Sequence, residues 1–317
     1  MTATWTYHKG LHEVGDGVFA YLQPDGSWGW SNAGLLVDGD ATLLVDTLFD
    51  LRLTAEMLDV MRRAVPQAAN IDTLFNTHGN GDHWFGNQLV EGARVLATRE
   101  AAAEMAEVPP ARLAGLLQAD AGDDPALAFL RRIFGPFAFD GIRPAFPTET
   151  FEQELVVKVG GLDAHLIDLG PAHTASDSAV FVPARRVVYT GDLLFIGGHP
   201  IMWAGPIENW IQATERLAAL DADVFVPGHG PITDREGVRR LGDYLRYVRD
   251  EAARFHAEGL TPLEAARRLR LDAYADWGDA ERLPVTIASI YRALDPEWPA
   301  PELPELFAMM AAYAGER

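Results

Sequence analysis

The chain has 317 residues, enough for one large domain or about two, and its 26 Lys and Arg against 46 Asp and Glu give a formal charge of −20. This balance argues against nucleic acid and against an anionic membrane surface as partners, because both are bound through clustered Lys and Arg. The sequence contains no cysteine, which excludes disulfides, thiolate nucleophiles and cysteine-ligated metals. Any metal must therefore be held by His, Asp, Glu or Asn side chains.

The sequence carries no sign of an export or membrane segment. The N-terminal residues lack the charged stretch followed by an apolar run that a signal peptide requires. No stretch approaches the roughly 20 consecutive apolar residues that cross a bilayer. We therefore expect a soluble, cytoplasmic protein whose partner is a small-molecule substrate.

The first third of the chain predicts strands with helices between them. Two apolar runs separated by Asp38-Gly39-Asp40 are typical of a β-hairpin, because an Asp-Gly pair favours the tight turn. Thr98 is a good N-cap, so we expect a helix directly after it. The expected strands are 17–22, 33–37, 41–46, 71–75 and 93–97, and the expected helices are 51–65 and 99–108.

The pattern changes at about residue 109, where helical pieces broken by Pro and Gly run to about 147. We interpret 109–147 as a helical insertion on the sheet scaffold, serving either as a lid over the site or as a cap on exposed sheet. Strands resume after it, and helices close the chain. These expected strands are 154–159, 164–169, 178–182, 187–189 and 224–226, and the expected helices are 208–220, 234–258, 261–269, 280–294 and 304–314.

One segment after a predicted strand concentrates metal-type ligands. It contains His78, Asn80, Asp82 and His83, with glycines between them. Because glycine permits a tight curl of the loop, all four side chains can face one point. The segment by itself is therefore a candidate for one side of a metal site.

Further along the chain, single ligand-type residues recur where a strand meets a Gly or Pro turn. His173, Asp192 and His229 each stand at such a place, and the segment 31–34 is a weaker case. One such segment would mean little. The segment at 78–83 and the places of His173, Asp192 and His229 make four, and four in this order predict a metal centre.

These motifs, in this order, resemble those of the metallo-β-lactamase-fold hydrolase superfamily over about residues 15–235. The resemblance implies an α+β fold, a four-layer αββα sandwich with the metals at one edge of two sheets. We place the core at 1–235 and a C-terminal helical extension, packed on that core, at 236–317; the extension could build a homodimer interface or merely complete the fold. The implied ligands are His78, Asn80 and His173 for one metal, Asp82, His83 and His229 for the second, and Asp192 bridging both.

Asn80 departs from the family's His-x-His-x-Asp-His motif, which has His at this position. A neutral amide oxygen is a poorer zinc donor than an imidazole nitrogen, so this site should be weaker or select a harder ion such as Mn or Fe. The resemblance thus implies one or two Zn²⁺. Asn80 could equally be the turn former of the Gly-Asn-Gly sequence.

The absence of cysteine indicates which branches of the family the chain resembles. Branches that destroy β-lactams place Cys where Asp192 stands, whereas Asp is similar to the glyoxalase-II, lactonase and thioesterase side. The resemblance therefore implies hydrolysis of an ester, thioester or lactone. A bound metal would lower the pKa of water from about 15.7 towards 7 and supply hydroxide, with Asp82 orienting or deprotonating that water. The other metal, or Asn80 as an amide donor, would stabilise the developing oxyanion.

Two other functions stay open at the level of the sequence. Some branches of the superfamily hold iron, so a metal-dependent oxygenase is one alternative. A non-catalytic binding protein, in which Asn80 marks a degenerate metal site, is the other.

Several aromatic residues and one further histidine flank the metal motifs. The aromatic residues either form an apolar wall for a substrate or pack in the core. His199 either reaches the rim of the pocket or has a structural role. The aromatic residues concerned are Trp28, Trp30, Trp84 and Trp203.

Overall fold

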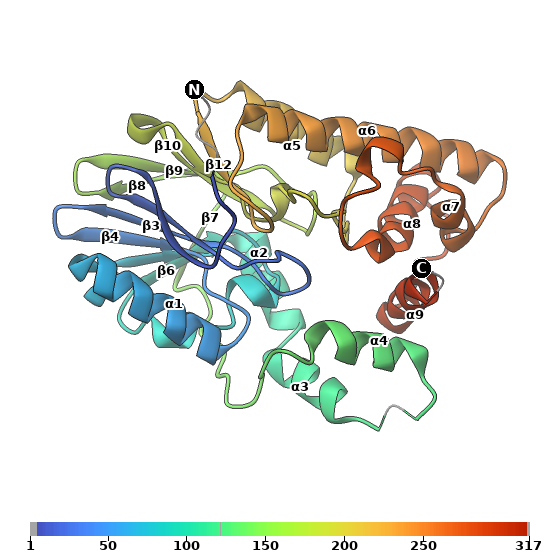
Figure 1. Cartoon of the computed structure of the whole chain (residues 1–317), viewed down its shortest axis with the longest axis horizontal. Helices are drawn as coiled ribbons and strands as arrows, with labels where there is room; N and C mark the ends of the chain where they lie inside the picture. Colours follow the sequence, from blue (N-terminus) through green and yellow to red (C-terminus); the bar gives the residue numbers. More distant parts are fainter. Residues whose placement is uncertain (1–4, 121, 316–317) are drawn as a thin grey trace.

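The computed structural model describes residues 5–120 and 122–315, in which two mixed β-sheets pack face to face between outer helices (Figure 1). The first sheet is antiparallel from its edge to β4 and parallel from there on. Its strands, in spatial order, are β1 (Gly10–Gly15), β2 (Val18–Leu22), β3 (Ala33–Asp38), β4 (Ala41–Val45), β5 (Thr73–Phe75), β6 (Arg94–Thr98) and β7 (Glu149–Phe151).

The second sheet is antiparallel except for its last pair, which is parallel. Its strands, in spatial order, are β12 (Val224–Val226), β11 (Val187–Tyr189), β10 (Ser178–Val182), β9 (Leu162–Asp168) and β8 (Glu154–Val159). The two sheets with helices outside them confirm the predicted α+β sandwich.

Apolar side chains from both sheets fill the space between them. Leu36 and Phe75 of the first sheet and Val180 and Val187 of the second belong to one fully buried cluster. The sheets approach so closely at Gly34 that a Cβ there would lie 2.3 Å from the Tyr189 ring. Burial of this kind is the main favourable term in folding, so the inter-sheet core holds the strand ends, and the loops that follow them, in place.

Several helices begin at a residue whose side chain caps them. Asp50 accepts a hydrogen bond from the Leu53 amide, Thr98 accepts one from the Ala101 amide, and Thr261 forms a capping box with Glu264. The helices are α1 (Leu51–Ala64), α2 (Arg99–Glu107), α3 (Pro110–Gln118), α4 (Pro125–Phe134), α5 (Ile207–Ala219), α6 (Arg235–Ala257), α7 (Pro262–Arg268), α8 (Leu283–Leu294) and α9 (Leu303–Ala314).

Two strands of the first sheet were not expected from the sequence. The strand β1 is an edge strand, and most of its side chains are only partly buried, so it lacks the apolar run that predicts a strand. The strand β7 has three residues, two of them exposed, and it pairs only with β6. Both strands are defined by pairing with a neighbour rather than by their own pattern.

The helices of the insertion and of the C-terminal part meet beside the sandwich, as Figure 1 shows for α4 and α9. Phe129 of α4, Val285 of α8 and Phe307 of α9 share a buried cluster with Trp28 from the first part of the chain. A larger cluster likewise joins residues on both sides of position 235. The boundary at 235 stays a prediction, and the two parts share hydrophobic cores.

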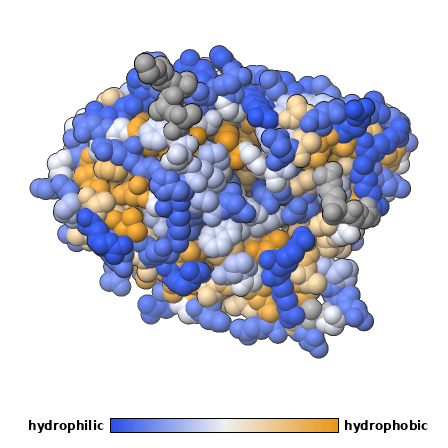
Figure 2. All heavy atoms as spheres, viewed as in Figure 1, coloured by the Kyte–Doolittle hydropathy of each residue, from blue (hydrophilic) through white to orange (hydrophobic). Residues whose placement is uncertain are grey.

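Hydrophilic side chains dominate the face of the molecule in Figure 2, interspersed with apolar patches. Within the described residues, no helix combines the length and the apolarity that crossing a membrane would need.

Candidate metal centre

The predicted ligand residues come together at one edge of the sandwich. His78 follows β5, His173 follows β9, Asp192 follows β11 and His229 follows β12. A short 3-10 helix at Gly81–His83 brings Asp82 and His83 to the same place. The strand ends that are followed by ligand-type residues in the sequence therefore lie close together in the structure.

The Asp192 carboxylate lies at the centre of four histidines. Its Oδ1 is 3.1 Å from Nε2 of His83, and its Oδ2 is 3.3 Å from Nε2 of His173 and 3.4 Å from Nε2 of His229. His78 is slightly further away, with its Nε2 at 3.9 Å from Oδ2. This position between the rings is the one expected of a carboxylate that bridges two ions.

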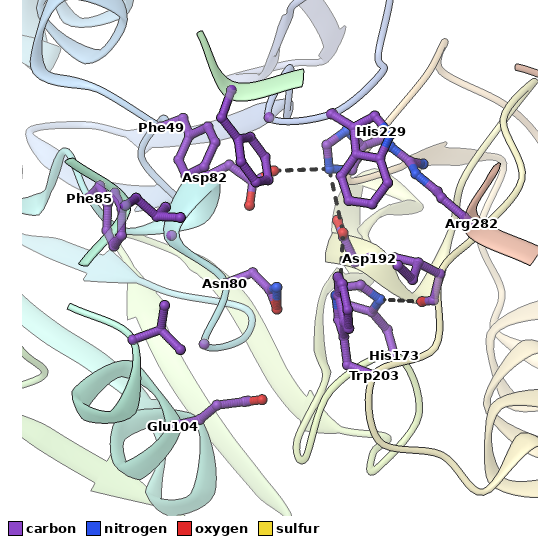
Figure 3. A pocket seen from close by; sticks show the side chains of 18 of the residues that line it. Phe49, Asn80, Asp82, Phe85, Glu104, His173, Asp192, Trp203, His229 and Arg282 are labelled. Atoms are coloured by element: carbon purple, nitrogen blue, oxygen red, sulfur yellow. Dashed lines mark hydrogen bonds and ion pairs between the residues drawn. The ribbon is translucent and has the colours of Figure 1, made fainter. Parts of the chain in front are cut away.

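The second acidic residue, Asp82, lies to one side of this centre. Its Oδ2 is 3.3 Å from Nε2 of His229 and 3.8 Å from Nε2 of His83 (Figure 3). Among the described residues, two groups have ligand atoms within 4.8 Å of one another: His78, His83 and Asp192, and Asp82, His83 and His229.

The hydrogen bonds of the histidines fit a metal at this place. Each ring has its Nδ1 within hydrogen-bond distance of an acceptor outside the cluster, so its Nε2 faces the centre and can bind a metal once it is deprotonated. The Nε2 atoms of His78, His83 and His173 are buried and have no hydrogen-bond partner. The acceptors are Thr77 Oγ1 for His78 at 3.0 Å, Asp46 Oδ2 for His83 at 2.9 Å, the Ile201 carbonyl for His173 at 2.6 Å and the Gly26 carbonyl for His229 at 3.0 Å.

The Asp and His side chains of the cluster shift one another's pKa values. Burial opposes ionisation of Asp82, but the facing His83 and His229 outweigh it and lower the pKa of its carboxyl to about 2. For His229, burial is likewise outweighed by Asp192 and Asp82, which raise its pKa to about 9. Burial, together with the positive charge of His83, lowers the pKa of His78 well below its usual value. Both carboxylates are therefore ionised, as metal ligands must be.

Asn80 lines the cavity next to the cluster, and Figure 3 shows its side chain extending toward Asp192 and His173. Its backbone has φ −73° and ψ 137°, an extended conformation that any residue adopts, and its side chain does not cap the following turn. The backbone therefore does not require Asn at this position. The choice between a ligand and an amide donor stays a prediction.

Asp46 is a residue of the site that the sequence reasoning missed. Its buried carboxylate accepts hydrogen bonds from the Thr77 amide, from Thr77 Oγ1 (each 2.8 Å) and from Nδ1 of His83. It directly follows β4 and has φ 62°. The same strand-end signal that marked the ligands was present here, but without the Gly or Pro turn that we required.

A cavity of about 270 Å³ opens over the metal-type cluster. Its walls are mainly apolar and come from distant parts of the chain: the loop at 28–29, the insertion, the loop at 201–203 and the C-terminal helices. The insertion therefore does line the cavity. The apolar wall consists of Trp28, Phe49, Phe85, Val108, Leu113, Phe134, Phe195, Ile201, Trp203, Leu303 and Phe307.

The four tryptophans and His199, which flank the metal motifs in the sequence, either line the cavity or are packed in the core. Trp28 and Trp203 line the cavity. Trp84 is buried and Trp30 is packed against the core of the first sheet. His199 is fully buried, and its Nδ1 lies 2.8 Å from the Tyr244 hydroxyl, which makes it a structural residue.

Comparison with known sequences gives one family match and two informative relatives. A profile of the family described as Metallo-beta-lactamase superfamily matches residues 26–229. A linear primary-alkylsulfatase from Pseudomonas sp. is 28% identical over 150 residues, which are 43% of this chain and 28% of the relative. The alpha subunit of a 2,4-dinitroanisole O-demethylase from Nocardioides sp. is 27% identical over 202 residues, which are 62% of this chain and 51% of the relative. The chain thus spans about a quarter and about half of the length of these relatives.

Solved structures share the fold. A metallo-beta-lactamase from Pontibacter korlensis superposes with a TM-score of 0.57 at 18% identity, covering 75% of this chain and 99% of that one. The stereoselective inverting sec-alkylsulfatase Pisa1 from Pseudomonas sp. superposes with a TM-score of 0.67 at 16% identity, covering 92% of this chain and 52% of that one. The likeness to the second structure therefore extends beyond the sandwich into the C-terminal helices.

Proposed function

This chain belongs to the metallo-beta-lactamase superfamily, and from that premise we propose that it is a metal-dependent hydrolase of an ester, thioester or lactone that bears a hydrophobic group. The observation that carries the proposal is the buried His and Asp cluster on the floor of an apolar cavity. The branch we propose is the glyoxalase-II and lactonase side, because Asp192 stands where the β-lactam-cleaving branches have Cys.

We assign the ligands as membership of the family implies. His78, His173 and Asn80 would hold one ion, Asp82, His83 and His229 would hold the second, and Asp192 would contribute to both sites. Zn²⁺ suits this set of imidazoles and carboxylates, and the amide at 80 makes Mn or Fe the alternative. When bound, such an ion acts as a Lewis acid and acidifies a coordinated water.

The residues of the chain divide the work of hydrolysis in this proposal. Asp82, held ionised by His83 and His229, orients the attacking water and accepts its proton. Asn80 reaches into the cavity beside the cluster, where its amide can donate a hydrogen bond to the oxyanion that develops on the substrate. Asp46 fixes the orientation of His83 through the Nδ1 hydrogen bond.

The shape of the cavity supports a substrate with an aryl or alkyl group. Its walls carry seven phenylalanine and tryptophan side chains: Trp28, Phe49, Phe85, Phe134, Phe195, Trp203 and Phe307. The two curated relatives are named for removing a sulfate group from an alkyl chain and a methyl group from an aromatic ether. Both names describe an oxygen-linked group on an apolar body, which is the kind of molecule that the cavity fits.

Turnover of a substrate panel tests the proposal. Protein purified without added metal is analysed for its metals, and it is then assayed on aryl esters, thioesters, lactones, an alkyl sulfate and an aryl methyl ether. We expect hydrolysis of at least one class, loss of it with a chelator, and recovery with Zn²⁺ or Mn²⁺. Asp82→Asn should lower kcat by about 100-fold or more, because it removes the proton acceptor.

The control is Asp72→Asn, which alters a carboxylate that hydrogen-bonds Thr42 far from the cluster and should leave turnover unchanged. Absence of metal-dependent turnover on every class, with Asp82→Asn equal to the wild type, would disprove the hydrolase. Bound iron together with oxygen consumption would instead establish the oxygenase.

A further inference from the structure

We propose that Arg282 recognises an oxyanion on the substrate, so that the cavity selects esters carrying a sulfate or carboxylate group together with an apolar tail. The inference rests on the proposed hydrolase and names its class of substrate. Arg282 lies outside the segment that matches the family, in the C-terminal part of the chain just before α8.

The Arg282 guanidinium is held at the wall of the cavity by aromatic rings. The residue is 2% exposed and lines the cavity. Its Cζ lies 4.4 Å from the centre of the Trp28 ring and 5.4 Å from that of Phe195. The Phe195 ring in turn stacks on His229 at 5.2 Å, so one aromatic ring separates the guanidinium from a proposed ligand. Figure 3 shows Arg282 extending from the C-terminal part toward this ligand.

The hydrogen bonds of Arg282 leave donors free for a ligand. A guanidinium carries five N–H groups. One terminal nitrogen donates to the His199 carbonyl at 3.2 Å, and the other pairs with Asp279 Oδ2 at 3.2 Å. The Nε atom is buried and has no hydrogen-bond partner. A buried donor without an acceptor is unfavourable, and an oxyanion in the cavity would supply acceptors for the fork.

Arg282 places a positively charged side chain at this end of the cavity. Among the described residues that line it, Arg282 is the single Lys or Arg, whereas Asp82, Asp192 and Glu104 are acidic. Asp279 pairs with Arg282 through Oδ2 and accepts a hydrogen bond of 2.6 Å from the Ser27 hydroxyl at Oδ1, so this carboxylate fixes the position of the guanidinium. An arginine stacked between rings presents a fixed planar fork, which suits sulfate and carboxylate better than a mobile lysine would.

The remaining walls define the other half of the substrate. The apolar side chains of α4 and α9 that line the cavity, Phe134, Leu303 and Phe307, offer a surface for a short alkyl or aryl tail. A molecule with an oxyanion at one end and such a tail at the other satisfies both parts of the cavity. A neutral ester of the same length contacts the apolar surface but offers no oxyanion to Arg282.

Binding of inert analogues to the metal-loaded protein tests the proposal without turnover. The probes are hexanesulfonate, heptanoate and the neutral hexyl methyl sulfone, with dissociation constants measured by calorimetry. The wild type should bind at least one of the two anions about 10-fold or more tighter than the sulfone. Comparison of the dissociation constants of hexanesulfonate and heptanoate decides whether the preferred oxyanion is a sulfate or a carboxylate.

Arg282→Gln should weaken binding of the preferred anion by about 10- to 100-fold, the range of a charge-assisted hydrogen bond, and change sulfone binding by less than about 3-fold. Arg282→Lys keeps the charge beside Asp279 and should lose about 3- to 10-fold, which covers the case in which the glutamine variant does not fold. The matched control is Arg132→Gln, because Arg132 also stacks on an aromatic ring, Phe129, but does not line the cavity. It should leave both affinities unchanged.

The outcomes separate this inference from the proposed function. Equal affinity of the wild type for anions and sulfone, or equal losses for both in the Arg282 variants, would overturn the inference and make Arg282 a structural residue. Turnover of neutral esters without any anion preference would do the same while leaving the hydrolase intact. An Arg282-dependent anion preference without turnover of any substrate would keep the inference and remove the hydrolase.

Discussion

Glu104 adds a carboxyl group to the wall of the cavity, on the side of Asn80 and away from the histidines (Figure 3). It lies on α2, packed so closely against Gly79 that a Cβ at 79 would be 2.9 Å from its Oε2. Burial raises the pKa of Glu104 to about 7, although hydrogen bonds from the Ala175 amide and Thr174 oppose the rise. This side chain is thus neutral in part of the physiological range.

The raised pKa makes a prediction about stability and pH. The folded protein keeps the Glu104 proton up to about pH 7, whereas the unfolded chain releases it near pH 4.5, so this contribution is full below about pH 4.5 and is lost as the pH rises to 7. Glu104→Gln removes the titrating carboxyl and therefore this pH-dependent loss of stability. Between pH 5 and pH 8 the free energy of unfolding of the metal-free wild type should fall by roughly 2 kcal/mol more than that of the variant.

Urea unfolding at the two pH values measures the difference. The control is Glu100→Gln, an exposed residue of the same helix, which should keep the pH dependence of the wild type. If Glu104→Gln also kept it, the Glu104 carboxyl would be ionised throughout and the interpretation of its burial would be wrong.

At the scale of the elements, the loops after β11 and β12 are fitted to each other around one glycine. The Gly228 amide donates to the Gly191 carbonyl at 2.8 Å, and the Gly228 carbonyl accepts from the Asn32 amide at 2.8 Å. A Cβ at 228 would lie 2.0 Å from Oδ1 of Asp192. The absence of a side chain here is therefore a condition for the position of the Asp192 carboxylate.

Gly228→Ala should displace Asp192 and lower the metal content of the purified protein by at least one equivalent per chain. The overpacking should also reduce the free energy of unfolding by about 1–3 kcal/mol. Elemental analysis and denaturant unfolding measure the two effects.

Gly115→Ala is the matched control, since a Cβ there meets nothing within 4 Å and the residue lies inside the helix α3. It should keep full metal content and stabilise the protein by about 0.5–1 kcal/mol. A Gly228→Ala variant with wild-type metal content would show that the loops can move apart at no cost to the site.

At the scale of the whole molecule, the C-terminal part reaches back to the metal centre. Ser27 Oγ donates to Asp279 Oδ1 at 2.6 Å, and Trp28 Nε1 donates to Glu281 Oε1 at 3.0 Å. The neighbouring Gly26 carbonyl accepts the Nδ1 hydrogen bond of His229. Residues more than 250 positions apart thus hold the loop that orients one proposed ligand.

Ser27→Ala should therefore weaken metal binding even though Ser27 touches no ligand. Loss of a group that orients a ligand typically costs 10- to 100-fold in metal affinity, and we expect about 3- to 10-fold for this more distant hydrogen bond. Competition with a chromogenic chelator measures the affinity.

The control for this prediction is Thr214→Val, which removes a buried hydroxyl bond of 2.7 Å to the Ile211 carbonyl within α5, at a residue that does not line the cavity. Both variants should lose about 1 kcal/mol of stability, but only Ser27→Ala should lose metal affinity. Equal metal affinity in the two variants would mean that His229 is oriented without the C-terminal part.

Much of the fold and the types of ligand could be predicted from the sequence, because these features are carried by neighbours in the chain. The predicted hairpin around Gly39 is present, with Gly39 at φ 60°, and Thr98 caps α2 as expected. His78 and His229 stand where strands end, and strand ends are legible from local apolar runs. The edge strand β1 carried no such run and was missed.

What only the tertiary structure decided is which distant side chains serve those ligands. Asp46 and His83 are 37 positions apart, and the Gly26 carbonyl is 203 positions from His229. Arg282 comes to the cavity because the C-terminal helices share hydrophobic cores with the rest of the chain. Such contacts depend on burial and packing between elements, and no local periodicity records them. The sequence therefore determined the kind of chemistry, and the packing of its two ends decided the cavity in which that chemistry would act.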